Sequence, residues 1–309
     1  MMLEAGLAGA RFFHLACAII LFGGTSFVLY SRLDVGRSKR LTPLPAILTT
    51  AALGALLSGL AWFVLTAANM SGALVDALDR ETLSSVLWDT SFGLVWALRA
   101  PLIILILAVI WWRGISALSR PAIAFLTFLT AIQLASLAGI GHTQVHEGVP
   151  AGVHVTADAV HLLAAGAWLG GLLPLCLFLA PDQTAQVSND EAVRILSRFS
   201  GMGYVAVAVL IASGSINSWF LIGSLPHLID TSYGQLLLSK LGLFGLMLLL
   251  ALSNRFRLVP AIAQSKTATG SERLLARLRR QVGGELVLAL LVVGILSVLG
   301  TLSPAVHGS

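Results

Sequence analysis

The chain has 309 residues, of which 57% are hydrophobic and only 11% are charged. A soluble globular domain carries about 25% charged residues and must keep its exterior wet, so this composition excludes a soluble fold. The net charge of +5 does not indicate a nucleic-acid partner, because the basic residues lie in short loops between apolar runs, as the orientation determinants of membrane proteins do.

Eight apolar runs are each long enough for a helix to cross the hydrocarbon core, which takes about 20 residues. They lie at about 8–30, 44–68, 91–112, 121–141, 154–180, 199–222, 235–254 and 283–303. Pro121 opens the fourth run and Pro304 closes the last. The sequence therefore predicts an all-α fold, a polytopic integral membrane protein with eight transmembrane helices that form a single domain over residues 1–309.

The distribution of positive charge predicts the orientation of these helices in the lipid bilayer. Fifteen of the 19 Lys and Arg residues lie in the loops after the first, third, fifth and seventh runs. Only Arg11 and Arg80 lie on the opposite side, while Arg99 and Lys240 fall within runs. Cytoplasmic loops are the ones enriched in Lys and Arg. We therefore expect the basic loops in the cytoplasm and both termini in the periplasm.

Segments outside the runs add little chemistry. Residues Ser71–Thr90 are expected to hold a short interfacial helix, and Ser271–Gln281 a basic helix that lies on the cytoplasmic face. Cys17 and Cys176 lie far apart within apolar runs and give no disulfide framework. The first run is long enough to span, so we expect no cleaved signal peptide. No nucleotide-binding motif occurs, and we expect no enzyme activity.

All seven histidines fall on the predicted outer side or in the outer third of the membrane. His14 and His161 lie within the first and fifth runs, and the others border or lie in outer segments: His142, His146, His154, His227 and His307. Polar groups inside a membrane are costly and usually functional, and histidine is the commonest metal ligand. The pattern predicts a metal site that opens outward.

Spacing along the fifth run brings further donors to His161. His154, Asp158 and His161 stack on one helix face over about 10 Å. We expect His14, His161 and the loop residue His142 to form the site, with His146 and His154 at its entrance. Asp158 would orient a ring by accepting its second N–H. Arg99 or Lys240 is expected within reach of Asp158, because three charges at similar depth should not stay solitary in hydrocarbon.

The donor set limits the choice of metal without fixing it. Five methionines, two of them Met1 and Met2, are too few for a path of stacked thioethers that would pass Cu(I). Imidazole and carboxylate donors suit copper, zinc or nickel, and composition does not choose among these metals.

Five stretches of the chain form a recognisable set. They are the first span with His14 (FFHLACAIILFGG), the GHTQ around His142, HLLAAGAWLGGLLPL from His161, the RFS at 198–200 and YGQLLLSKLGLFGLMLLLALSNRFRLVP around Lys240. Together these stretches resemble the copper resistance protein D family. The resemblance covers nearly the whole chain. It implies a multi-pass protein of the bacterial inner membrane that binds copper ions and moves them from the periplasm toward the cytoplasm. A periplasmic copper-binding protein is a candidate partner.

The resemblance carries over most directly to His14, His142 and His161, and less so to His146, His154 and His307, which lie in loop and tail segments. One alternative is a haem b redox protein, because bis-His ligation also needs histidines in transmembrane helices. A second is a factor that delivers copper without transporting it. The sequence leaves open the oxidation state of the metal, the direction and driving force of transport, the oligomeric state and the role of Cys17.

Overall fold

The chain folds into a bundle of membrane-spanning helices. The computed structural model describes residues 2–72, 75, 78–140, 149–180, 188–222, 226–265 and 267–302. Within these residues eight helices are long and apolar enough to cross a membrane, which confirms the predicted fold class. They contain α1 (Met2–Ser31), α2 (Leu44–Ser71), α4 (Ser91–Arg113), α5 (Arg120–Ala135), α6 (Val149–Phe178), α7 (Asn189–Ile222), α9 (Ser232–Ser253) and α11 (Ala268–Leu299). The α5 span continues through a 3₁₀ turn to Gly139.

Short helices join the long ones. At one end of the bundle lie α3 (Arg80–Asp89), inside the segment predicted to hold an interfacial helix, and α8 (His227–Asp230). Asp79 caps α3, because its carboxylate accepts the Thr82 N–H at 2.8 Å. At the opposite end a π-helix (Asn254–Leu258) joins α9 to α10 (Val259–Gln264). Three 3₁₀ turns complete the described connections: Lys39–Leu41, Ile115–Ala117 and Ser136–Gly139.

The basic stretch Ser271–Gln281 differs from expectation. It is helical, but it forms the first part of α11 and not a separate helix along the membrane surface. Gly283 and Gly284, which follow it, do not break the helix. Glycine is common in transmembrane helices, where it costs less than in a water-exposed helix. The last helix is therefore longer than its apolar run.

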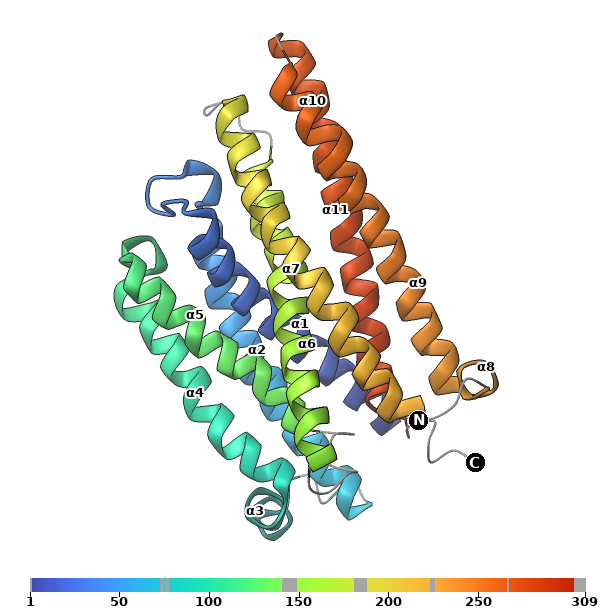
Figure 1. Cartoon of the computed structure of the whole chain (residues 1–309). Coiled ribbons are helices and arrows are strands. Elements are labelled where there is room, and N and C mark those ends of the chain that lie inside the picture. The colour runs from blue at the N-terminus through green and yellow to red at the C-terminus, as the bar shows by residue number, and fades with distance from the viewer. Residues whose placement is uncertain are drawn as a thin grey trace.

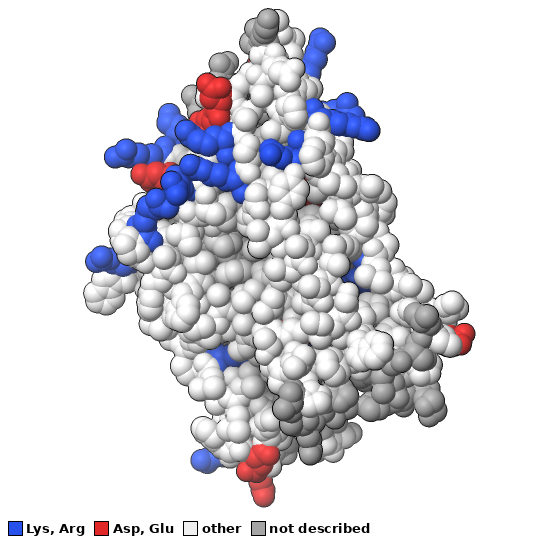
Figure 2. All heavy atoms as spheres, in the orientation of Figure 1, with Lys and Arg blue, Asp and Glu red and all other residues white. Residues whose placement is uncertain are grey.

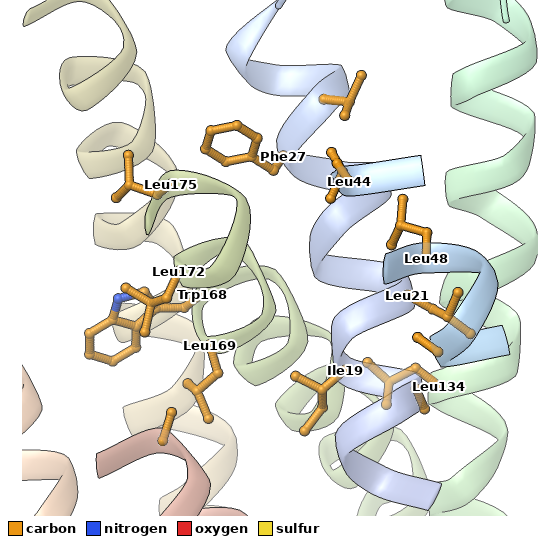
Figure 3. Packing of buried hydrophobic residues seen from close by; sticks show 14 of the residues in the cluster. Ile19, Leu21, Phe27, Leu44, Leu48, Leu134, Trp168, Leu169, Leu172 and Leu175 are labelled. Atoms are coloured by element: carbon orange, nitrogen blue, oxygen red, sulfur yellow. The ribbon is translucent and has the colours of Figure 1, made fainter. Parts of the chain in front are cut away.

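Helix α1 lies at the centre of the bundle and contacts α2, α5, α6, α7 and α11 (Figure 1). It packs closely on α6, where Gly23 and Gly170 bring the two backbones together: a Cβ on Gly23 would lie 2.3 Å from the Gly170 Cα. Small residues at a helix contact allow this approach in membranes. Around the contact, Ile19, Leu21 and Trp168 belong to the continuous apolar core (Figure 3).

Positive charge gathers at one end of the bundle, the basic end, which carries the α1–α2 connection and α10 (Figures 1 and 2). Some of these side chains cap helices there. Arg40 donates to the carbonyls of Phe178 at 3.0 Å and Ala180 at 2.5 Å, and Arg279 donates to Leu179 at 2.6 Å. Cations are favourable at helix C-termini. The opposite end, the α3/α8 end, is where α1 begins and α11 ends.

Candidate functional site

The intramembrane histidines lie in two separate polar clusters, one around His14 and one around His161. Both clusters lie in the half of the bundle nearer the α3/α8 end, since His14 and His161 are in the first halves of α1 and α6. His142 and His146 lie outside the described residues. Within those residues, no three His, Cys, Asp or Glu side chains gather closely enough to hold a metal ion.

The His14 ring is fixed on both of its nitrogens. Arg99 Nη2 lies 2.6 Å from Nε2, and the Ala55 carbonyl lies 3.0 Å from Nδ1. A guanidinium can only donate, so Nε2 accepts and Nδ1–H donates to Ala55. His14 is 1% exposed. Its Nε2 lone pair, which would bind a metal, is therefore directed at Arg99.

Arg99 crosses from α4 to the His14 ring and is itself 1% exposed. It donates to the Gln133 carbonyl at 2.6 Å and to the Ser136 hydroxyl, and its guanidinium lies 5.1 Å from the centre of the Trp96 ring. A buried cation in a membrane is tolerated where polar partners surround it. These contacts hold Arg99 in place against His14.

The His161 ring is held by helix α7. Its Nδ1 lies 3.0 Å from the Ser213 hydroxyl on α7, and Ser213 Oγ donates its hydrogen to the Val209 carbonyl at 2.6 Å. The hydroxyl therefore accepts from Nδ1–H, and the lone pair lies on Nε2. This is the tautomer in which Nε2 can serve as a metal ligand.

Asp158 lies one turn before His161 on α6 and forms a charge network with α7 and α9. Its Oδ1 accepts a hydrogen bond from Asn217 Nδ2 at 3.1 Å. Lys240 interacts electrostatically with both Asp158 and His161. Of the two cations expected near Asp158, Lys240 interacts with it electrostatically, whereas Arg99 hydrogen-bonds to His14.

The two rings face different neighbours although their helices pack together. His14 faces α2 and α4, and His161 faces α7. Sequence spacing predicts the depth of each ring but not the direction in which its helix turns it. His154 is 1% exposed and stacks on Phe220 of α7 at 4.9 Å between ring centres. It lies two turns before His161 on the same helix, so the row His154, Asp158 and His161 faces α7.

A cavity of about 220 Å³ lies between α6, α7, α9, α10 and α11, toward the basic end. Its polar wall contains Asn254, Arg255 and Glu285, and Asn254 Nδ2 donates to Glu285 Oε1 at 2.6 Å. Trp168, two turns past His161 on α6, lines the other end. Glu285 is not among the site residues predicted from the sequence. The signal that singles it out is a carboxylate inside a span.

Most of the chain matches known proteins of one family. Residues 2–153 match the family model "Copper resistance protein D-like, N-terminal domain", and residues 193–299 match "Copper resistance protein D". The chain is 33% identical to copper resistance protein D of Pseudomonas syringae pv. tomato, over 93% of each protein. It is also 33% identical to inner membrane protein YebZ of Escherichia coli, over 95% of this chain and 97% of that protein.

A third relative is the copper transport protein CutJ of Bacillus subtilis, 33% identical over 75% of this chain and 43% of CutJ. No solved structure matches the chain. Two matched family models, two relatives aligned over nearly their full lengths and eight candidate spans agree with one another. The chain is a multi-pass inner-membrane protein that belongs to the copper resistance protein D family.

Proposed function

We propose that this protein binds copper ions on the periplasmic side and moves them toward the cytoplasm, and that it is not an enzyme. The observation that carries the proposal is the His161 cluster. An imidazole whose lone pair is on Nε2 lies one turn from a carboxylate, in the outer half of the membrane as the positive-inside rule orients the chain. Imidazole nitrogen and carboxylate oxygen are ordinary ligands for copper.

Lys240 is part of this proposal because it already brings a positive charge to Asp158 and His161. A metal ion that binds between these two donors takes over the role of the ammonium. The long lysine side chain is flexible and can swing aside. Lys240 therefore keeps the site electrically balanced while copper is absent.

The expected entrance to the copper site lies between this cluster and the α3/α8 end. His154 lies two turns nearer the α3/α8 end on the same face of α6, and the sequence places His142 and His146 in the loop before it. We propose that these histidines pass copper to His161.

The cavity toward the basic end supports onward movement. Its lining includes Trp168, two turns beyond His161, and the hydrogen-bonded pair Asn254 and Glu285. A π-helix starts at Asn254, and single π-helical turns inside membrane helices are frequent at functional sites. Glu285 is the carboxylate that would receive the ion before it leaves at the basic end.

Copper binding to purified protein tests the site. Replacing His161 by Ala should lower copper affinity by about 10-fold or more, because even the loss of a residue that supports a metal ligand has an effect of this size. His227→Ala is the matched control, because His227 lies on α8 and hydrogen-bonds to the Ile222 carbonyl at 3.0 Å. Equal copper affinity in both variants would place the site elsewhere.

A visible absorption spectrum of the same preparation distinguishes copper binding from the haem alternative. The copper proposal predicts no Soret band. A Soret band that disappears in the His161→Ala variant would show that His161 binds haem and not copper.

A further inference from the structure

Two segments of the chain repeat each other in sequence. The start of α4 reads Asp-Thr-Ser-Phe-Gly at 89–93, and the start of α9 reads Asp-Thr-Ser-Tyr-Gly at 230–234. Ten residues after each Asp stands a cation, Arg99 in one case and Lys240 in the other. Likewise, His14 is followed after eight residues by Gly23-Gly24, and His161 after eight residues by Gly170-Gly171.

The contacts of the two histidines repeat as well. Ser58 on α2 lies 3.3 Å from His14 Nδ1, as Ser213 on α7 lies 3.0 Å from His161 Nδ1. The residue three positions earlier provides a backbone hydrogen bond to the same ring: Ala55 for His14 and Leu210 for His161. The residue after each serine is a glycine. A Cβ there would lie 3.2 Å from His14 Cε1 or 3.3 Å from His161 Cε1.

The turns before α4 and α9 have the same construction. Thr90 accepts the Gly93 N–H at 2.9 Å and donates to the Val86 carbonyl. Thr231 accepts the Gly234 N–H at 3.0 Å and donates to the His227 carbonyl. Each threonine directly follows a short helix, α3 or α8, that ends in aspartate.

Contacts between the two units are reciprocal. A Cβ on Gly23 of α1 would meet the Gly166 carbonyl of α6 at 2.5 Å, and a Cβ on Gly170 of α6 would meet the Ile19 carbonyl of α1 at 2.1 Å. Ile19 and Gly166 each lie five residues after their histidine. Such exchange of equivalent contacts is the mark of a two-fold relation. Four spans separate the starts of α1 and α6, so both units run in the same direction and the axis lies along the membrane normal.

The two sites differ at two charged positions. The first has Arg99 where the second has Lys240. Three residues before the histidine, the first has Arg11, which lies 4.7 Å from the Trp62 ring centre, and the second has Asp158. The first site thus has a second cation where the second has a carboxylate. Arginine also keeps its charge in proteins, and Arg99 occupies the Nε2 lone pair of His14 directly.

We propose that the chain is a tandem duplication of a four-helix unit that contains one metal site per unit, and that the first of these sites is closed by Arg99, with Arg11 at the position of the missing carboxylate. The metal part of this inference rests on the copper function proposed above. Its consequence is that the first site retains the histidine, serine and backbone carbonyl of a copper site and lacks only the carboxylate and the exchangeable cation.

Exchanging the charged residues between the units tests this directly. The double variant Arg11→Asp, Arg99→Lys gives the first unit the charged residues of the second. The full-length protein, purified in detergent and dialysed against copper, should bind about one more copper ion per chain than the wild type, since one imidazole–carboxylate set is added. Adding His14→Ala should remove that extra ion. The reciprocal variant Asp158→Arg, Lys240→Arg should abolish the copper bound through His161.

The results of these experiments distinguish failure of the closed-site inference from failure of the proposed function. Unchanged copper content in a folded Arg11→Asp, Arg99→Lys protein overturns the closed-site inference. If that variant does not stay monodisperse, the single change Arg99→Gln, which frees Nε2, should still raise copper content in a His14-dependent manner, and no rise overturns it. If the wild type binds no copper, the proposed function fails.

Imidazole ¹⁵N NMR then tests the duplication without metal. It should show the Nδ1–H tautomer for both His14 and His161, with Ser58→Ala perturbing only the former and Ser213→Ala only the latter. Different tautomers on the two rings would contradict equivalent sites.

Discussion

Asp158 is the residue on which the second cluster depends. It lies beside His161, accepts a hydrogen bond from Asn217 and interacts with Lys240. The change Asp158→Asn keeps the size of the side chain and removes its charge. We expect copper affinity to fall about 10- to 100-fold, as loss of a carboxylate that supports a metal ligand does.

The control for this change is Asp230→Asn, which removes an exposed carboxylate on α8 at the same end of the molecule. Equilibrium dialysis of both variants measures the effect. An equal small loss in both would mean that surface charge attracts the ion and that Asp158 is no part of the site.

For individual side chains, the sequence predicts the depth in the membrane but not the contacts. The depth of His14, His161, Asp158 and Lys240 follows from their positions in apolar runs, and that much was predictable. The partner of each residue depends on how its helix is rotated about its own axis. A span buried on most sides has no clear polar face to reveal that rotation. The bond between Arg99 and His14 could therefore not be derived from spacing.

At the scale of helices, Gly23 and Gly170 bring α1 and α6 into close backbone contact. A methyl group at Gly23 would overlap the backbone of Gly170 at 2.3 Å. We expect Gly23→Ala to destabilise the protein by about 1–3 kcal/mol, the usual cost of overpacking. Gly9→Ala in the same helix is the matched control, because a Cβ there meets nothing within 4 Å.

Thermal unfolding in detergent, followed by tryptophan fluorescence, compares the two alanine variants. A lower midpoint in Gly23→Ala and an unchanged or raised midpoint in Gly9→Ala is the expected result. Equal midpoints would show that the helices can move apart at no cost, so that this contact does not hold the two units together.

The number and order of the helices were predictable because a span must hide its backbone polar groups in a continuous helix of about 20 apolar residues. The ends were less so. Helix α7 begins at Asn189 and α11 at Ala268, both well before their apolar runs. A helix can continue into water beyond the bilayer, and hydrophobicity does not mark where it starts.

For the whole molecule, the predicted orientation follows from the basic end (Figure 2). Single cysteines at Ser119, before α5, and at Ser84, in α3, would lie at opposite ends in a protein whose Cys17 and Cys176 are replaced by Ala. In intact cells a membrane-impermeant maleimide should label the cysteine at 84 and not the one at 119. The reverse labelling would invert the topology and place the His161 cluster on the cytoplasmic side.

The most direct test of the central claim is copper uptake by proteoliposomes that contain the purified protein and a copper-sensitive dye inside. Protein inserted with its basic end inward should raise the dye signal over that of empty liposomes, and His161→Ala should bring uptake back to that background while His227→Ala leaves it unchanged. Uptake equal to that of empty liposomes, from wild-type protein that still binds copper, would contradict transport and leave a protein that binds copper without moving it.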